Sequence, residues 1–171
     1  MEISHASKLH FTFAFCESDC VGPIDGTHVR AMVPVRIQGR FRSRKDHPTK
    51  NILAAIGFDL NFTYVLAGCE GLAHDSIILD DALTRRNRLI VHDGKYYLAD
   101  GGYGVRKKFI PPYCGVRYHL KEYSNHEPEN HMELFNFRHP SIRTIERGFE
   151  VLKKRFPILD ARMHWSYEQK I

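Results

Sequence analysis

The stretch CVGPIDGTHVRA, residues 20–31, combines a strand-like apolar run with an Asp-Gly pair at Asp25 and Gly26. Asp-Gly is a common signal for a tight hairpin turn, so one interpretation is a turn between two strands. The other is that Asp25 is an acid presented at the end of a strand. We expect this strand to continue past a bend into a second extended piece.

A second strand-like run, KYYLAD at residues 95–100, also ends in an acid followed by glycine. Glycine next to Asp25 and Asp100 lets a cation, a phosphate or the backbone approach closely. Two such acids on neighbouring strands, with a third from a helix, can hold two divalent ions. Oxygen ligands suit Mg²⁺ or Mn²⁺.

A long helix is predicted over residues 140–159, with proline in its first turn and Pro157 at its end. Apolar residues at helical spacing form its expected buried stripe, namely Ile142, Ile145, Phe149, Leu152 and Phe156. Glu146 lies at the margin of this stripe, where a carboxylate is costly unless it is paired or metal-bound. A salt bridge to Lys153, or to Arg143 or Arg147, is the alternative that these residues alone favour.

An earlier helix is predicted over residues 73–89, with Asp75 and Ser76 capping its start and arginines in its last turn. Capping accounts for Asp75 without any chemistry. His28 and His74 are expected near the acids, although a single histidine usually has a structural role.

The remaining segments complete the expected architecture. Residues 51–60 and 62–70 read as an antiparallel hairpin, residues 36–50 as a basic loop, residues 109–120 as extended and residues 121–132 as a polar loop. The order β-β-β-α-β, an extended segment and a long helix predicts an α/β protein in which helices pack on the faces of one sheet.

Composition narrows the classes of function. The chain has 171 residues, enough for one domain, and no uncharged apolar run long enough to span a membrane. Four cysteines at irregular spacing are unlike a disulfide framework, and no second Cys/His pair follows at the spacing of a zinc finger. The net charge of +5 and its basic clusters indicate a polyanion partner, nucleic acid, and solvated surface charge is the alternative. Candidate DNA-contacting residues are Arg40, Arg42, Arg44, Lys45, Arg106, Lys107 and Lys108.

Five strings occur in one order along the chain: IDGTH, FTYVLAGCEGLAHDS, YYLADGGY, GVRYHLKE and ELFNFRHPSIRTIERGFEVLKKRFPIL. Together they resemble the DDE nuclease domain of PIF/Harbinger transposases and Harbinger-like nucleases, the plant-type members most closely. The resemblance covers roughly residues 20–159. It implies an RNase H-like fold, with a mixed sheet of about five strands and flanking helices.

The same resemblance implies a divalent-metal-dependent DNA endonuclease in which Asp25, Asp100 and Glu146 are the catalytic metal ligands. Asp75, His28 and His74 are candidate supporting residues. The implied cofactor is Mg²⁺ or Mn²⁺, as two ions. The implied partners are DNA and a Myb/SANT-like DNA-binding protein, and the implied location is the nucleus.

The sequence also departs from the family pattern. We expect a short N-terminal remnant at residues 1–19, the nuclease domain at 20–160 and a tail at 161–171, as in a chain truncated at both ends. Pro23 lies in a strand that should be central, where it removes a hydrogen-bond donor. An inactive, domesticated fragment that binds DNA or a protein partner is therefore the alternative function, and a fragment without a stable fold is a third.

Overall fold

The computed structural model describes residues 19–42, 46–118, 120–123, 127–139 and 141–161. Within them lies a five-stranded sheet with the order β3-β2-β1-β4-β5. The strands are β1 Cys20–Arg30, β2 Thr49–Ile56, β3 Phe62–Glu70, β4 Tyr96–Ala99 and β5 Phe109–Ile110. The β1–β2 and β2–β3 pairs are antiparallel, whereas β1–β4 and β4–β5 are parallel. This mixed α/β sheet confirms the predicted fold class and is consistent with an RNase H-like fold.

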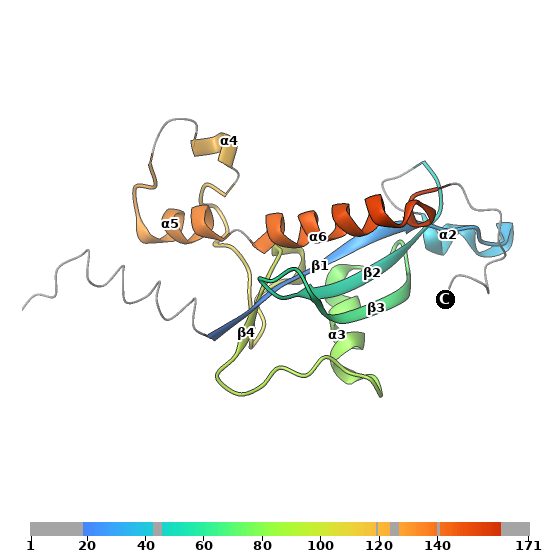
Figure 1. The fold of residues 1–171 in the computed structure, drawn as a ribbon, viewed down its shortest axis with the longest axis horizontal. Coiled ribbons are helices and arrows are strands. Elements are labelled where there is room, and N and C mark those ends of the chain that lie inside the picture. Colours follow the sequence, from blue (N-terminus) through green and yellow to red (C-terminus); the bar gives the residue numbers. More distant parts are fainter. Residues whose placement is uncertain (1–18, 43–45, 119, 124–126, 140, 162–171) are drawn as a thin grey trace, which may run out of the picture.

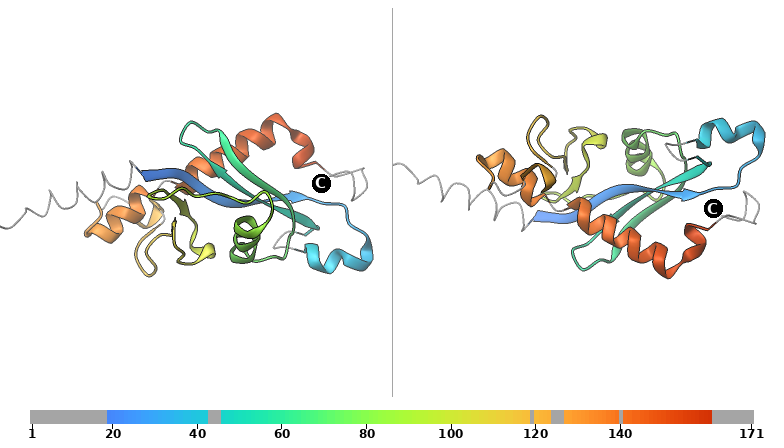
Figure 2. Two further views of the ribbon diagram at one scale, coloured as in Figure 1. Left: turned by 90° about the horizontal axis from the view of Figure 1, so that it is seen from below. Right: turned by 90° about the horizontal axis from the view of Figure 1, so that it is seen from above.

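Two longer helices cover opposite faces of the sheet: α3, Asp75–Thr84, and α6, Ser141–Arg155 (Figures 1 and 2). The other helices are α2 Gln38–Phe41, α4 Leu120–Tyr123 and α5 His131–Arg138. Short 3₁₀ turns are η1 Val35–Ile37, η2 Gly101–Tyr103 and η3 Pro157–Leu159. The sheet is thus the middle layer, and each face has its own apolar packing.

Strand β2 supplies apolar side chains to both layers, which is why its sequence reads as a nearly continuous apolar run. Leu53 and Ala55 belong to the core cluster that includes Leu79 of α3. Because side chains alternate along a strand, the neighbouring residues face the other helix. Ala54 and Ile56 pack there with Ile145 and Phe149 of α6.

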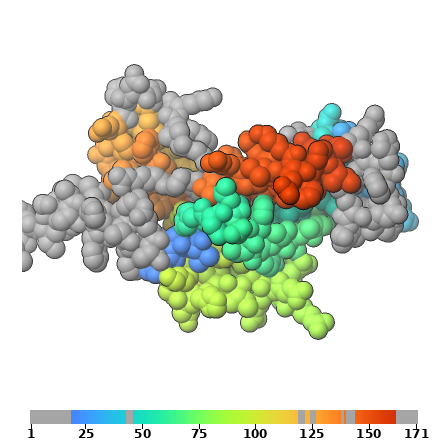
Figure 3. All heavy atoms as spheres, in the orientation of Figure 1, coloured from blue at the N-terminus to red at the C-terminus, as the bar shows by residue number. Residues whose placement is uncertain are grey.

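Helix α6 lies close to the sheet. A Cβ added at Gly148 would lie 2.4 Å from Cδ1 of Ile56, so glycine permits the close packing at this point. The space-filling view shows α6, in orange-red, lying along the teal and green residues of β2 and β3 (Figure 3). The position of α6 relative to the sheet matters because this helix carries Glu146.

The hairpin interpretation of the Asp25-Gly26 pair is wrong, and so is the expectation that a strand ends at Asp25. Strand β1 runs without interruption through both residues to Arg30, and Asp25 pairs with Ala54 of β2. Pro23 is buried in this central strand, next to Leu98 of β4, and a register irregularity lies between Cys20 and Gly22. The proline is therefore accommodated within a continuous strand.

The predicted helix over residues 73–89 is shorter than expected. It ends at Thr84, so Arg85 follows the helix and no basic residue lies in its last turn. His74 occupies the N-cap position, and Asp75 is the first helical residue, so the predicted cap by Asp75 and Ser76 is also wrong.

Several further expectations need correction. The segment 36–50 contains η1 and α2 rather than only a loop, and in the segment 109–120 only Phe109–Ile110 forms a strand. Helix α5 was not predicted, because HMELFNFR has little amphipathic periodicity.

On α6, Ile145 and Phe149 are buried as expected, whereas Phe156 follows the helix and is exposed. The side chain of Ile142 lies outside the described part of the chain.

No helix among the described residues is long and apolar enough to cross a membrane.

Candidate active site

Asp25 and Asp100 come from two adjacent parallel strands. Ile24 of β1 pairs with Ala99 of β4, and each acid is the next residue along the chain. Because paired residues of adjacent parallel strands direct their side chains to the same face, the residues that follow this pair, Asp25 within β1 and Asp100 just after β4, lie at the same level and on the same side. This register brings together two acids that are far apart in the sequence.

Asp100 follows directly after β4, as predicted, and begins the turn η2. Its carboxylate accepts a hydrogen bond from the backbone N–H of Gly101 at 2.7 Å. Asp100 is only partly buried, so it remains accessible from the end of the strand.

Glu146 comes from α6, which packs against β1, β2 and β4. It follows Ile145, whose fully buried side chain fixes the helix on the sheet, and its own side chain is exposed. Among the described residues it forms no ion pair. Lys153, the expected partner, donates instead to the backbone carbonyl of His28. The salt-bridge interpretation of Glu146 is therefore not supported by the described contacts, and the side chain of Arg143 lies outside them.

The electrostatic environment of Asp25 is acidic. Burial is the main reason that its pKa rises from 3.8 to about 7, and the N–H of Gly26 opposes this rise. The charged groups that raise the pKa further are Asp100, Asp75 and Glu146. The structure therefore brings Asp100, Glu146 and Asp75 close enough for their charges to act on Asp25.

Asp75 approaches the two acid-bearing strands from α3. Asn51 Nδ2 of β2 donates to Asp75 Oδ1 at 3.5 Å. A Cβ added at Gly102 would lie 3.0 Å from Asp75 Oδ2 and 3.7 Å from Asp100 Oδ2. The second glycine after Asp100 therefore leaves space for the Asp75 carboxylate, and this side chain has a tertiary role beyond its place at the helix start.

Two neutral polar residues in this region were not predicted. Asn51 Oδ1 and the Tyr103 hydroxyl are buried and have no hydrogen-bond partner among the described residues. Both lie beside Gly26, where a Cβ would be 3.0 Å from Asn51 Oδ1 and 3.3 Å from the Tyr103 hydroxyl. The sequence signal for Asn51 was weak, an amide at the start of an apolar strand, and Tyr103 read only as a core aromatic.

The two histidines are less closely tied to the acids. His28 Nδ1 lies 3.0 Å from Thr49 Oγ1, and His74 is an exposed residue at the N-cap of α3. Neither is among the groups that shift the pKa of Asp25.

Several of the candidate DNA-contacting residues form ion pairs within the chain. Arg40 pairs with Glu70, Arg106 with Asp80 and Lys108 with Asp93. Two others, Arg42 and Lys107, are exposed. Arg44 and Lys45 lie outside the described residues. The internal ion pairs reduce the positive charge that Arg40, Arg106 and Lys108 present to a polyanion.

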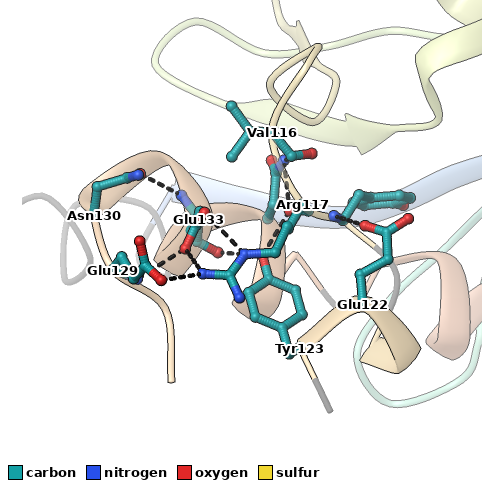
Figure 4. A network of polar contacts seen from close by, with 9 residues as sticks. Val116, Arg117, Glu122, Tyr123, Glu129, Asn130 and Glu133 are labelled. Carbon is teal, nitrogen blue, oxygen red and sulfur yellow. Dashed lines mark hydrogen bonds and ion pairs between the residues drawn. The ribbon is translucent and has the colours of Figure 1, made fainter. Parts of the chain in front are cut away.

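The segment between Asp100 and Glu146 is held by a polar network around Arg117 (Figure 4). Its guanidinium pairs with Glu133 of α5 at 2.7 Å and with Glu129 at 3.2 Å. The hydroxyl of Tyr123 donates toward the backbone carbonyls of Arg117 and Glu133.

A second set of bonds ties this network to the sheet. Asn136 of α5 accepts from the N–H of Tyr113 at 2.8 Å, and its amide donates to the carbonyl of Tyr113 at 3.0 Å. His139 Nε2 lies 3.2 Å from the carbonyl oxygen of Ile110 in β5. The chain leading into α6 is thereby attached to the edge of the sheet, which limits where α6 can begin.

The donor set of the site suits a hard divalent cation. No three His, Cys, Asp or Glu side chains within the described ranges converge as a ready-made metal cluster. The charges of the other three acids nevertheless act repulsively on Asp25, and an orphan amide oxygen and hydroxyl lie beside Gly26. Carboxylate and amide oxygens are the ligands that Mg²⁺ and Mn²⁺ prefer. A cation bound here would relieve the repulsion and satisfy these oxygens, so the residues fit the implied metal.

Comparison with known proteins identifies the family. The family model described as DDE superfamily endonuclease matches residues 24–171, which include all four acids. Searches of curated proteins and of solved structures each gave no significant match. Endonucleases of this superfamily generally use divalent metals. The chain therefore belongs to the DDE superfamily endonucleases, and its mixed five-stranded sheet agrees with this assignment.

Proposed function

We propose that this chain cleaves phosphodiester bonds of DNA with divalent cations, Mg²⁺ or Mn²⁺, held by Asp25, Asp100 and Glu146. The observation that carries the proposal is the acidic environment of Asp25, whose pKa is raised by Asp100, Asp75 and Glu146. A buried or half-buried acid placed among other acids is costly to a fold. A cation that binds between them offsets this cost.

Each acid has a distinct role in holding the ions. Asp25, within β1, and Asp100, directly after the adjacent parallel strand β4, would both hold the ions. Glu146, on α6, closes the site from the side of that helix. Divalent ions bound in pairs activate an attacking water or 3′-hydroxyl and stabilise the departing oxygen. The carboxylates therefore act as ligands, and no side chain needs to act as a nucleophile.

The proposal extends to descent from Harbinger transposases and to a nuclear location. The sequence blocks IDGTH, LADGGY and IER, each containing one of the three acids, support that descent. A separate DNA-binding partner of the Myb/SANT type would then direct the nuclease to its target. Strand transfer would use the same site with a 3′-hydroxyl as the attacking group.

The test is a nicking assay on supercoiled plasmid, with purified chain in Mg²⁺, in Mn²⁺ and in EDTA. We expect nicked product only with metal. The nicking rate of Asp100→Asn should fall by at least ~100-fold, because a neutral amide replaces the carboxylate that would bind the metal. The matched control is Asp93→Asn, an exposed acid paired with Lys108 in the loop before β4. Circular dichroism and thermal melting of each variant check the fold.

Undiminished cleavage by both Asp25→Asn and Asp100→Asn would overturn the assignment of the acids. Salt-dependent DNA binding without any metal-dependent product would instead favour the binding-only alternative.

A further inference from the structure

Asp75 is joined to the site by contacts on both sides of its carboxylate. Oδ1 accepts from Asn51 Nδ2 at 3.5 Å, and Oδ2 lies within 3.0 Å of the position that a Cβ of residue 102 would take. Asp100 Oδ2 lies 3.7 Å from that same position. Because Gly102 has no side chain, the Asp75 carboxylate can occupy the space beside Asp100 and does not remain at the surface of α3.

The orphan atoms beside Asp75 point to a ligand. Asn51 is 2% exposed and Tyr103 is 1% exposed, and neither Asn51 Oδ1 nor the Tyr103 hydroxyl has a partner among the described residues. Leaving a buried polar atom unsatisfied costs roughly 1–3 kcal/mol. Both atoms lie within 3.3 Å of the Cβ position of residue 26, and Asp75 Oδ1 lies 3.5 Å from it. They therefore converge on one small region next to Asp25.

The chemistry of these atoms selects a hydrated cation. Asn51 Oδ1 can only accept a hydrogen bond, and a water bound to a divalent ion is a strongly polarised donor. The oxygen of the Tyr103 hydroxyl also carries lone pairs, so it can accept a hydrogen bond from a second such water. Magnesium usually keeps several of its waters in protein sites, which supplies partners for both atoms.

We propose that Asp75 is a fourth acidic residue of the cation site, and that Asn51 and Tyr103 are positioning residues which hydrogen-bond the waters of the bound ion. This inference rests on the proposed function, since it concerns the same cations. Asp75 supplies an oxygen from the α3 side of the sheet, opposite to α6, which carries Glu146. The site would then draw its acids from both helix layers of the fold.

The test measures cation binding without DNA and without turnover. Mn²⁺ is titrated into the full chain at about pH 7.5, and the heat of binding is measured by isothermal calorimetry. In a parallel titration, the concentration of free Mn²⁺ is measured from its electron paramagnetic resonance signal. We expect Asp75→Asn and Tyr103→Phe each to weaken Mn²⁺ binding by ~10-fold or more, the usual range for residues that support a metal site. Asp81→Asn is the matched control, because Asp81 is on the same helix and pairs with Arg85 away from the acids.

Melting curves in EDTA separate binding from folding. Tyr103→Phe keeps the ring and its packing, so it tests the proposal even where Asp75→Asn lowers stability. Wild-type affinity in both variants, with binding lost in Asp100→Asn, would overturn the role of Asp75, Asn51 and Tyr103 and leave the proposed function intact. A wild-type chain that binds no Mn²⁺ would overturn both proposals together.

Discussion

Replacing Asp25 by asparagine should stabilise the metal-free fold at neutral pH while removing a proposed cation ligand. In the folded chain the pKa of Asp25 is raised to about 7 from 3.8, mainly by burial and then by Asp100, Asp75 and Glu146. The folded state therefore holds the proton more tightly than the unfolded state. The stability that Asp25 contributes is fully present below its unfolded pKa of 3.8 and is lost as pH rises through the folded pKa of about 7.

The size of the effect follows from the size of the pKa shift. One pKa unit corresponds to ~1.4 kcal/mol, so the complete loss amounts to about 4 kcal/mol. Between about pH 5 and pH 7.5 the titration of this one carboxyl lowers the free energy of unfolding by roughly 2–3 kcal/mol. The asparagine side chain of the variant has no charge to bury, so the free energy of unfolding of Asp25→Asn should not show this decrease.

Urea unfolding in EDTA at about pH 5 and about pH 7.5 measures the difference. The comparison uses wild type, Asp25→Asn and the control Asp59→Asn, whose carboxylate is exposed and accepts from Asn61. The other groups that titrate between these pH values are common to all three chains. The difference in the free energy of unfolding between wild type and Asp25→Asn, compared at the two pH values, therefore isolates the contribution of Asp25. If that difference is the same at both pH values, the reasoning about the acidic environment is refuted. Added Mn²⁺ should stabilise wild type and the control, but not Asp25→Asn.

Three further substitutions test the framework that positions the acids. Gly22→Ala should lower the free energy of unfolding by ~2 kcal/mol or more, because the residue has φ 145° and a Cβ there would lie 2.0 Å from the carbonyl oxygen of Ile56. A melting temperature equal to that of the wild type would show that the strands can move apart at little cost. Ile145→Ala should cost about 2–5 kcal/mol in urea unfolding, since its fully buried side chain fixes α6 on the sheet, and a cost below about 1 kcal/mol would contradict that anchor. Glu133→Gln should lower the melting temperature and the hydrogen-exchange protection of α5, because it weakens the pairing with Arg117; unchanged protection would mean that the network does not hold the helix.

The acids of the candidate site could be selected from the sequence, but their geometry could not. Two strand-like runs that each reach an Asp-Gly pair, and a glutamate on a late helix, were visible as a pattern, and the helix period placed Glu146 at the margin of the buried stripe. The sequence also indicated the β2–β3 hairpin, because two apolar runs are separated by a short turn. These features depend on residues close together in the chain, where local preferences act directly.

Local preference failed where a distant segment decides the conformation. Asp-Gly in isolation favours a turn, yet Asp25 and Gly26 lie in the middle of β1, because β2 pairs with both residues and with the strand as far as Arg30. Helix α5 has little periodicity of its own and is held by Arg117, which belongs to another segment. Propensity is a weak preference that such tertiary contacts override.

What the sequence by itself determined is the choice of Asp25, Asp100 and Glu146 as candidate acids, and the apolar segments that carry them. Only the tertiary structure decided that Asp25 and Asp100 lie at one level of the sheet, through the parallel register of Ile24 with Ala99. It also placed Asp75 beside them, where Gly26 and Gly102 leave the space. The physical reason is that register and close approach depend on backbone contacts between segments distant in the chain, whereas residue type and spacing are local properties of the sequence.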